Sequence, residues 1–372
     1  MGIKTHHVGI FVSSLQTGGA EKVAITMSNE FARSGLRVDL IVMKSGGELE
    51  PLVSKEVRIF RLETNRGRSS LLSLLRYIRQ NRPEAVLSFL TVPNSLLGLT
   101  KIVLRSRSPR LVGSERSYMT DVNIRGDRKI LTYLCYKIAT RIGYRMLDVN
   151  IALTEGICDR MVAQRLAKQS KIVVLPNPID LKHISPRENA TTKSIDKIEL
   201  LAVGRLDDLK DYPTMFRAIQ ILNEKHDVSL AILGEGDKRQ ELEMLIDALK
   251  LSDNIKLYGN VANTSSWFSQ ADLLILSSKM EGFPNVIVEA LAHGVPTVST
   301  DCPTGPREIL QGTKYGELVP VGDFRALANA VPTLLNRQLK SDFLRKRAED
   351  FDSQKICKSY EKLIIGYRSV ND

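Results

Sequence analysis

The stretch EGFPNVIVEALAHGVP, residues 281–296, decides the fold of the half of the chain in which it lies. An apolar run, DLLILSS at 272–278, precedes it, and a second one, VPTVSTD at 295–301, ends the segment. Short apolar runs of this kind are typical of buried strands, and the segment between them is long enough for one helix. A strand, a helix and a second strand in this order predict one unit of a parallel α/β sheet.

Two carboxylates frame the predicted helix. Glu281 lies on the loop before the helix, and Glu289 lies inside it. We expect Asn285 to cap the first turn and Gly294 to adopt the left-handed conformation that ends the helix. The free backbone N–H groups and the positive dipole end at a helix N-terminus attract anions. The stretch therefore predicts an anion site with acids beside it.

The length and composition are those of a globular protein with two domains. The chain has 372 residues, of which 43% are hydrophobic and 26% charged. The first apolar run, HHVGIFVSS at 6–14, begins almost at once, so no signal peptide is expected. No apolar run is long enough to predict a membrane span. The four cysteines lie far apart without metal-ligand spacing, which is typical of a reducing cytosol.

The net charge of +11 is unevenly distributed. Residues 1–178 carry 28 Lys and Arg against 14 Asp and Glu, whereas the remainder carries 25 against 28. This imbalance predicts that the first half binds an anionic partner, although a basic surface can also serve only to keep a protein in solution. A nucleic-acid partner is disfavoured, because no basic motif with interleaved aromatic residues is present.

Apolar runs alternate with amphipathic runs along both halves, which predicts an α/β protein built from two Rossmann-like, doubly wound domains facing a cleft. We place the N-terminal domain at 1–178 and the C-terminal domain at 197–352, separated by a linker rich in Pro and polar residues. The last segment, 353–372, begins with an amphipathic helix. Ligands bind such sheets at the carboxyl ends of the strands, where the motifs below fall.

The stretch at 281–296 resembles the signature of the type-4 family of retaining glycosyltransferases, which have the two-Rossmann-domain (GT-B) architecture. The signature is a pair of glutamates separated by seven residues, with Gly-Phe-Pro after the first, as in Glu281 to Glu289. The resemblance implies a nucleotide-sugar donor bound mainly by the C-terminal domain, an acceptor bound by the N-terminal domain, and a last helix that crosses back onto the N-terminal domain.

Two basic residues after the first strand of the second half predict a diphosphate site. The run VGRLDDLKDYP contains Arg205, whose planar fork suits phosphate, and Lys210, a movable point charge. The alternative is an ordinary pair of surface cations. The family has a similar Gly-Arg and Lys pattern that binds the diphosphate, so we expect Arg205, Lys210 and Glu281 to carry the reaction, with Glu281 at the transferred sugar.

The family resemblance also implies a set of donor-binding residues. Glu289 is expected at the ribose, and the loop after the first strand at the donor diphosphate. A plain structural turn is the alternative for each glycine motif, and Glu308 in PTGPREIL is a further candidate. The implied binding residues are Gly18, Gly19, Gly234, Gly236, Gly282, Phe283, Pro284, Asn285, Glu289 and Glu308.

The acceptor side departs from the family pattern. Many members carry a histidine on the first domain near the reacting sugar, but SFLTVPN and VGSERS occupy the corresponding strand ends here. Asn94, Glu115 and Arg116 are the polar candidates for binding the acceptor. Members that act on lipid-linked oligosaccharides, capsule or O-antigen units have a similar Ser-Glu-Arg run. The implied acceptor is a polyprenyl-diphosphate-linked saccharide, as in bacterial surface polysaccharide synthesis.

Neither a metal nor another cofactor is expected. The one Asp-x-Asp, at 350–352, lies far from any apolar strand end, so a metal-dependent inverting mechanism is not supported. A sugar-nucleotide epimerase would need acid–base residues in the first domain that the sequence does not identify. A non-catalytic nucleotide-binding module remains the alternative from a different class of protein. For a transferase, a UDP-sugar is the favoured donor and a GDP-sugar is possible.

The basic first half predicts peripheral attachment to the inner face of the cell membrane. One set of basic residues, Arg125, Arg128, Lys129, Lys137, Arg141 and Arg145, is interleaved with apolar residues and reads as a basic amphipathic helix. Two further basic sets lie at 66–82 and 101–110. We therefore expect a cytoplasmic protein whose first domain docks on an anionic membrane surface.

Overall fold

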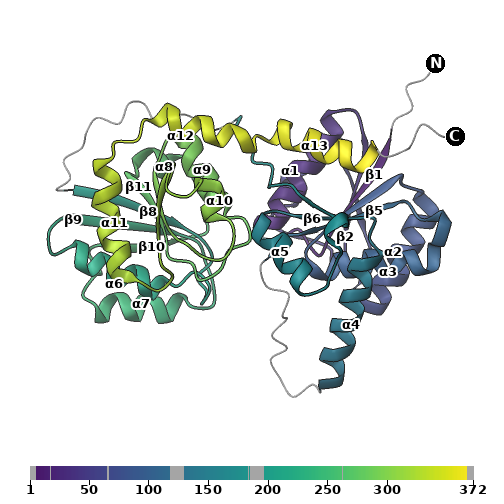
Figure 1. Cartoon of the computed structure of the whole chain (residues 1–372), viewed down its shortest axis with the longest axis horizontal. Coiled ribbons are helices and arrows are strands. Elements are labelled where there is room, and N and C mark those ends of the chain that lie inside the picture. Colours follow the sequence, from purple (N-terminus) through teal and green to yellow (C-terminus); the bar gives the residue numbers. More distant parts are fainter. Residues whose placement is uncertain are drawn as a thin grey trace. The chain divides into compact units, whose positions relative to one another are not determined.

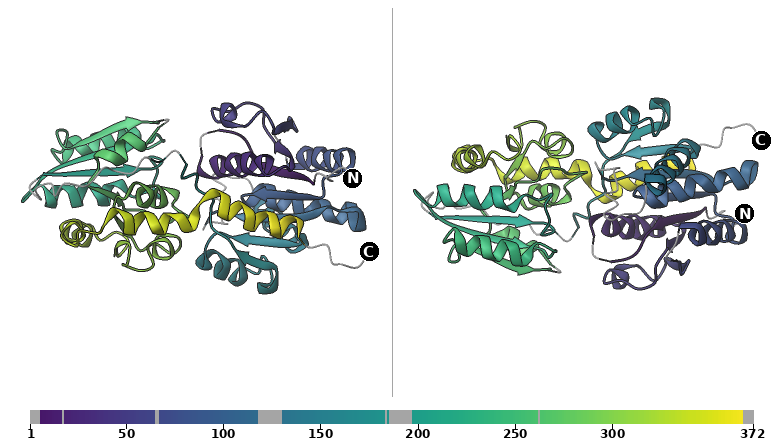
Figure 2. Two further views of the ribbon diagram at one scale, coloured as in Figure 1. Left: turned by 90° about the horizontal axis from the view of Figure 1, so that it is seen from above. Right: turned by 90° about the horizontal axis from the view of Figure 1, so that it is seen from below.

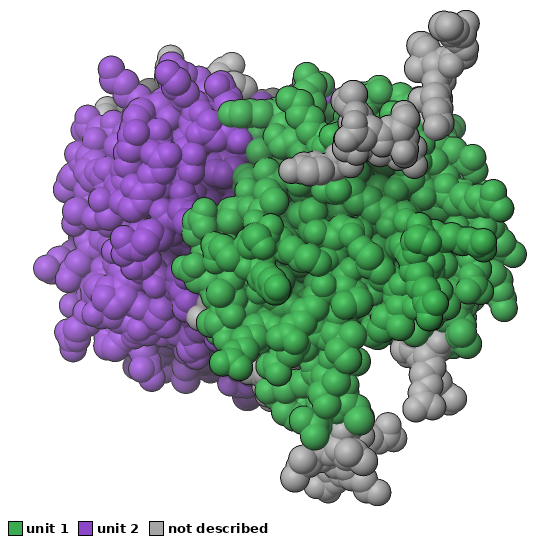
Figure 3. All heavy atoms as spheres, turned by 45° about the vertical axis from the view of Figure 1, so that its right-hand side comes forward, with its two compact units in different colours: residues 1–180, 352–372 green, residues 181–351 purple. Residues whose placement is uncertain are grey.

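The computed structural model describes residues 6–16, 18–64, 67–117, 130–182, 184, 197–261 and 263–366. The chain divides into two compact units, one formed by residues 1–180 with 352–372 and the other by residues 181–351 (Figure 3). Each unit contains one parallel sheet, and helices cover both faces of each sheet (Figures 1 and 2). This is the doubly wound α/β class that the sequence predicts.

The sheet of unit 1 has seven parallel strands in the order β3-β2-β1-β4-β5-β6-β7. Its strands are β1 (His7–Val12), β2 (Arg37–Val42), β3 (Arg58–Arg61), β4 (Ala85–Phe89), β5 (Arg110–Glu115), β6 (Val149–Ala152) and β7 (Ile172–Val174). Its helices are α1 (Gly19–Arg33), α2 (Gly67–Asn81), α3 (Thr91–Leu104), α4 (Ile130–Met146), α5 (Glu155–Ala163) and α13 (Ser353–Ile365). The inner strands are buried apolar runs, as a sheet covered on both faces requires.

The sheet of unit 2 has six parallel strands in the order β10-β9-β8-β11-β12-β13. Its strands are β8 (Lys197–Val203), β9 (Asp227–Leu233), β10 (Ile255–Gly259), β11 (Leu273–Leu276), β12 (Thr297–Thr300) and β13 (Gly316–Val319). Its helices are α6 (Tyr212–Leu222), α7 (Arg239–Ala248), α8 (Ser265–Gln270), α9 (Asn285–His293), α10 (Pro306–Leu310), α11 (Phe324–Asn336) and α12 (Ser341–Ala348). The strand order reverses between β8 and β11, which places the topological switch point there.

The C-terminal helix α13 belongs to unit 1, as the family resemblance implies. It lies beside α1, and its apolar face, including Ile356, Tyr360 and Ile364, joins the core formed by the first strands (Figure 1). The hydroxyl of Tyr360 donates to the carbonyl of Leu175 at 3.3 Å. The chain therefore returns to its first sheet after completing the second.

One local expectation is corrected by the structure. Asn285 is the first residue of α9 rather than its cap, because Pro284 occupies the cap position in an extended conformation, without a side-chain hydrogen bond to the first turn. The segment 303–310, which carries the candidate Glu308, contains the short helix α10, which begins at Pro306. A proline in the first helical turn has no N–H to leave unpaired, so it starts a helix easily.

The other end of α9 is as predicted. Gly294 has φ of +75°, the left-handed conformation that ends the helix. Within the described part of the chain, no helix combines the length and the apolar character needed to cross a membrane.

Candidate active site

The predicted reactive residues of unit 2 converge at its topological switch point. Arg205 and Lys210 lie on the loop after β8, and Glu281 lies on the loop after β11. These two strands are neighbours, and in a parallel sheet their carboxyl ends meet at the same edge. The fold therefore brings together groups separated by 71 residues in the sequence.

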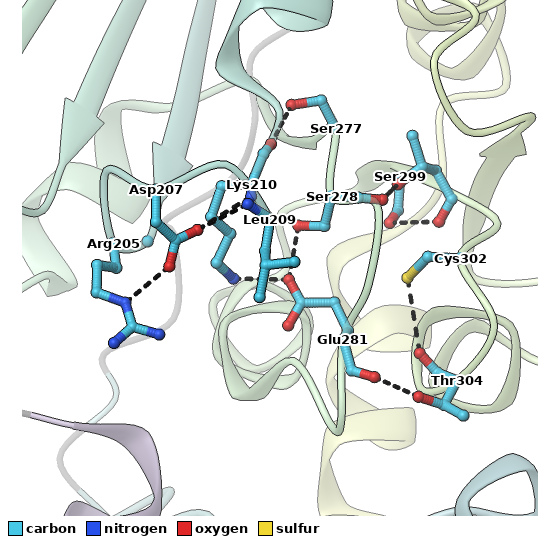
Figure 4. A network of polar contacts seen from close by, with 12 residues as sticks. Arg205, Asp207, Leu209, Lys210, Ser277, Ser278, Glu281, Ser299, Cys302 and Thr304 are labelled. Carbon is cyan, nitrogen blue, oxygen red and sulfur yellow. Dashed lines mark hydrogen bonds and ion pairs between the residues drawn. The ribbon is translucent and has the colours of Figure 1, made fainter. Parts of the chain in front are cut away.

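Lys210 and Glu281 form an ion pair at the centre of this edge. The Lys210 ammonium lies 2.6 Å from Oε1 of Glu281, and the Ser278 hydroxyl donates to the same oxygen at 2.6 Å (Figure 4). The side chains of Lys210 and Glu281 are only 22% and 11% exposed, so water screens their attraction weakly. Two of the three N–H groups of a lysine ammonium remain available when one donates to a carboxylate. The pair can thus hold Lys210 in place and still offer donors to an anion.

Arg205 lies on the same loop but is oriented differently. Its Nε donates to Asp207 at 2.8 Å, and its side chain is 74% exposed (Figure 4). The other oxygen of Asp207 accepts from the backbone N–H groups of Leu209 and Lys210, at 3.0 and 3.2 Å. Asp207 therefore fixes the loop that carries both cations, a role that the sequence analysis missed.

Hydroxyl groups tie the loop of Glu281 to its neighbours. Thr304 donates to the backbone carbonyl of Glu281, and Thr300 donates to that of Ser278 at 2.6 Å. The Ser277 hydroxyl donates to the carbonyl of Lys210 at 2.7 Å. Hydrogen bonds of buried hydroxyls to backbone restrict the loops after β8, β11 and β12 to one arrangement.

Burial changes the chemistry of a thiol at this edge. The pKa of the Cys302 thiol is raised to about 12 by burial and by the charge of Glu281. The thiolate is the nucleophilic form of a cysteine, so Cys302 is inert at neutral pH. It is a packing residue of the loop rather than a reactive group.

The glycines after β9 allow two loops to approach closely. Gly234 has φ of +147°, and a Cβ built there would lie 2.0 Å from the carbonyl oxygen of Gly204. A Cβ on Gly236 would lie 2.3 Å from the carbonyl oxygen of Leu206. Both positions exclude a side chain for steric reasons. The predicted turn is therefore part of the framework under Arg205.

The remaining predicted residues of unit 2 line the start of α9 and its surroundings. Phe283 is buried and contacts Phe351 edge to face at 5.5 Å, while Glu289 is partly buried on α9. Glu308 is partly buried on α10, where its backbone carbonyl accepts from Arg347 at 2.8 Å. Gly282 and Pro284 complete the entry to α9, which is fixed further because a Cβ on Gly305 would lie 2.5 Å from Pro284.

In unit 1 the glycine pair begins α1 directly after the loop that follows β1. Gly18 is the cap residue in an extended conformation with φ of −173°, and Gly19 is the first residue of the helix. The backbone conformation of Gly18 is open to any residue. Its lack of a side chain instead leaves space for Glu21, whose Oε2 would lie 2.2 Å from a Cβ on Gly18.

Two of the three residues predicted to bind the acceptor are buried and share a hydrogen-bond partner, the hydroxyl of Tyr144. Asn94 has no exposed surface and donates to the carbonyl of Ser114 and to the hydroxyl of Tyr144, at 2.9 and 3.1 Å. Glu115 is 1% exposed and accepts from that same hydroxyl. Their polar atoms are therefore largely used within unit 1, and a contact of either side chain with the acceptor stays a prediction.

Arg116 is also buried, but not every N–H group of its guanidinium has a hydrogen-bond partner among the described residues. Its guanidinium lies 4.0 Å from the centre of the Phe89 ring and donates to Asn177. Burial lowers its pKa to about 10, and its Nε has no hydrogen-bond partner within the described residues. The role of Arg116 towards the acceptor therefore stays a prediction.

No group of three or more His, Cys, Asp and Glu that could hold a metal occurs among the residues that the structure describes. The histidine of α9, His293, is buried and stacks on Phe268 with ring centres 4.9 Å apart. It is therefore a packing residue.

Comparison with known proteins identifies the family. Residues 17–183 match the family described as Glycosyltransferase Family 4, and residues 187–351 match the family described as Glycosyl transferases group 1. Together the two matches span most of both units. The chain belongs to the GT-B glycosyltransferases.

Two relatives of this glycosyltransferase come from Campylobacter jejuni. One, an N-acetylgalactosamine-N,N'-diacetylbacillosaminyl-diphospho-undecaprenol 4-alpha-N-acetylgalactosaminyltransferase, is 28% identical over 96% of this chain and 99% of its own. The other, an alpha-1,4-N-acetyl-D-galactosaminyltransferase whose name specifies a GalNAc-containing PP-undecaprenol, is 27% identical over 98% of this chain and 99% of its own. The similarity extends over the full length of both relatives.

Among solved structures, a glycosyltransferase from Rickettsia africae has a TM-score of 0.79 at 16% identity, covering 98% of this chain and 100% of its own. Anabaena HepE in complex with UDP has a TM-score of 0.77 at 17% identity, covering 97% and 100%. At these identities the likeness establishes the GT-B fold.

Proposed function

We propose that this glycosyltransferase moves an N-acetylhexosamine or a hexose from a nucleotide sugar, with UDP as the favoured nucleotide, to a saccharide linked to polyprenyl diphosphate. The reaction would retain the anomeric configuration and serve the synthesis of a bacterial surface polysaccharide. The observation that carries the proposal is the Lys210–Glu281 pair at the switch point of unit 2. Full-length similarity to two transferases with diphospho-undecaprenol substrates in their names supports the substrate class.

The role of Lys210 follows from where charge develops. When the bond between the anomeric carbon and the diphosphate breaks, its electron pair passes to a phosphate oxygen, so negative charge grows there. Lys210, held by Glu281, offers its remaining N–H groups to that oxygen, and the exposed guanidinium of Arg205 adds a second cation. The N-terminus of α9 contributes a positive dipole end. Fixed donors aimed at developing charge lower a barrier without reorganising.

Retention is proposed from the resemblance to the retaining family, and Glu281 is a poor candidate for the nucleophile that a double displacement would need. One of its oxygens already accepts from Lys210 and Ser278, which stabilises its charge and reduces its reactivity. We infer attack by the acceptor hydroxyl on the face from which the diphosphate departs, with the hydroxyl proton passing to the departing phosphate oxygen. Glu281 would bind hydroxyl groups of the transferred sugar, and Glu289 would bind the ribose.

Peripheral attachment of the basic first half to the inner face of the cell membrane belongs to this proposal. The acceptor would be embedded there by its polyprenyl chain, and the helix predicted from its interleaved basic and apolar residues is α4. Three of the cations assigned to that helix, Arg125, Arg128 and Lys129, lie outside the described residues.

A donor and acceptor matrix tests the proposal. The protein is incubated with UDP-GalNAc, UDP-GlcNAc, UDP-galactose or GDP-mannose, with and without a polyprenyl-diphosphate-linked saccharide. We expect one UDP-sugar to be consumed and the lipid-linked product to gain one residue. Interconversion of the donor without any acceptor would indicate an epimerase, and nucleotide binding without consumption would indicate a non-catalytic module.

A further inference from the structure

A cationic cavity lies in unit 1, away from the carboxyl ends of its strands. Its volume is about 630 Å³, and it is lined by the end of α4, by α5 and by the segment that leads into β7. Lys171 on its wall directly precedes β7, and Arg145 lies in the last turn of α4, shortly before β6, so the cavity lies at the amino ends of these strands. The lining residues are Arg145, Val162, Arg165, Ala167, Lys168 and Lys171.

The charge of this cavity is uncompensated. Four of its lining residues are basic and none is acidic. Lys171 has a structural task, because its ammonium donates to the carbonyls of Arg145 and Leu147 at the end of α4, at 3.2 and 3.1 Å. Among the described residues, no carboxylate pairs with Arg145, Arg165 or Lys168. Three unpaired cations around one cavity create a positive potential that attracts an anion.

The helix that leads to the cavity carries an exposed apolar row. Leu134, Ile138, Ile142 and Met146 are 51%, 50%, 39% and 37% exposed. Their spacing of four residues places them along one side of α4. Figure 1 shows α4 beside α3, extending away from the rest of unit 1 towards its N-terminal end. A row of exposed aliphatic side chains on a projecting helix is typical of a surface that meets a membrane or a partner.

A basic row runs beside the apolar row and ends at the cavity. Lys137, Arg141 and Arg145 follow the same spacing of four, each one position before an exposed apolar residue. Arg141 also donates to the carbonyl of Gln164, next to the cavity-lining Arg165. Apolar and cationic rows side by side match the layered chemistry of a bilayer surface, where acyl chains lie beneath phosphates.

We propose that this cavity binds the phosphate headgroup of an anionic phospholipid while the apolar row of α4 enters the acyl-chain boundary. The proposal rests on the membrane attachment included in the proposed function and assigns it to a specific site. The cationic lining selects a phosphate, and its continuity with the apolar row selects a lipid over a free anion. The site is separate from the groups that carry sugar transfer.

Vesicle co-sedimentation of the full chain tests the site. The vesicles contain phosphatidylcholine with or without phosphatidylglycerol. The variant R145Q/R165Q/K168Q removes the unpaired cations and keeps Lys171, which holds the end of α4. The control K225Q/K250Q/K346Q removes three exposed cations from unit 2, none with a partner among the described residues. The variant R145K/R165K/K168R keeps the charge of the cavity and shows whether substitution at these positions disturbs the local structure.

We expect wild type, the control and the charge-keeping variant to bind vesicles with phosphatidylglycerol. The cavity variant should lose roughly 10- to 100-fold in partitioning, since each basic side chain near an anionic surface contributes about a fivefold factor. Equal loss in the cavity variant and the control, or unchanged binding of the cavity variant, would overturn the proposal. Full displacement of the protein from vesicles by inorganic phosphate at matched ionic strength would assign the cavity to a free anion instead.

A transfer assay with a water-soluble, short-chain acceptor separates this proposal from the proposed function. The cavity variant should keep wild-type turnover in that assay, because none of its altered residues belongs to the site in unit 2. Vesicle binding that depends on the cavity, together with no transfer by any variant, would leave the lipid site standing and contradict the transferase proposal.

Discussion

The ammonium of Lys210 lies 2.6 Å from the carboxylate of Glu281, at the point where the strand order of unit 2 reverses. The pair joins the loop after β8 to the loop after β11, and both side chains are largely shielded from water. A shielded ion pair is costly to form unless its geometry is good and further hydrogen bonds complete it. Here Ser278 supplies one such bond, so the pair is a preorganised element of the site.

The two glutamates are expected to respond differently to neutralisation. Glu289→Gln should weaken the binding of free UDP, because contacts to the ribose exist before and during the reaction. Glu281→Gln should reduce sugar transfer more than affinity for free UDP, because its proposed partner is the sugar. Calorimetric titration of both variants with UDP measures the difference. Wild-type UDP affinity in Glu289→Gln would remove the ribose assignment.

The close approach of two loops at Gly234 predicts a large effect of a small substitution. Gly234→Ala combines a left-handed backbone with a Cβ 2.0 Å from the carbonyl oxygen of Gly204. Gly322→Ala is the matched control, since Gly322 has φ of +79° but no atom within 4 Å of a built Cβ. We expect about 1 kcal/mol of destabilisation from backbone strain in the control and several times that in Gly234→Ala. Urea unfolding measures both, and equal effects would show that the loops can move apart.

A buried carboxylate in unit 1 predicts a dependence of stability on pH. Asp39 has no exposed surface, and although burial raises its pKa, hydrogen bonds from His7, Arg58 and Tyr77 lower it further, so the net pKa lies well below the usual range. Its contribution to stability is complete above the unfolded pKa of about 3.9 and is lost as the pH falls below that value.

Asp39→Asn tests this contribution. We expect a loss of roughly 3 kcal/mol in the free energy of unfolding near neutral pH, because His7 and Arg58 then lose a buried charge partner. The difference between wild type and Asp39→Asn should shrink at acid pH. A difference that stays constant from neutral pH to about pH 3 would mean that Asp39 does not titrate as inferred.

The stereochemistry of the product tests the mechanism. We expect the transferred sugar to keep the anomeric configuration that it has in the donor, as judged by NMR of the product. We also expect EDTA to leave most of the activity intact, because the cations of Arg205 and Lys210 are proposed to neutralise the diphosphate. An inverted product, or a loss with EDTA that Mn²⁺ restores, would contradict front-face attack without a metal.

The sequence predicts the doubly wound architecture and the elements around Glu281, because a short apolar strand and a helix-ending glycine such as Gly294 are each specified by residues close together in the chain. The approach of Lys210 to Glu281 depends on strand order, which no local pattern specifies. From the sequence, the two residues were therefore expected only to lie at the same edge of the sheet, and their shared site was implied by the family resemblance. Asp207 could have been found from its position before two backbone N–H groups in a tight loop.

The buried partners of the predicted acceptor residues could not be read from the sequence. Asn94 lies in the first turn of α3, and Glu115 is the last residue of β5. A polar residue near a strand end has the same sequence signature whether it faces a ligand or another side chain. Tyr144, which lies 50 residues from Asn94 and 29 from Glu115, completes a buried network with both. The cationic cavity was missed for a related reason, since the rule for α/β sheets directs attention to the carboxyl ends of strands.

The most direct test of the account compares Lys210→Ala with Lys279→Ala in transfer from the accepted UDP-sugar. Lys279 lies on the same loop as Glu281, but it is half exposed and pairs with Asp211 at 3.2 Å, so it controls for the loss of a nearby charge. We predict that Lys210→Ala loses about 2–4 kcal/mol of transition-state stabilisation, a fall in kcat/KM of roughly 30- to 1,000-fold, as expected for a lost donor to a developing charge. Lys279→Ala should stay within about threefold of wild type, as expected for an exposed charge outside the site. Undiminished transfer by folded Lys210→Ala, or an equal fall in both variants, would contradict the assignment of Lys210, held by Glu281, to the donor diphosphate.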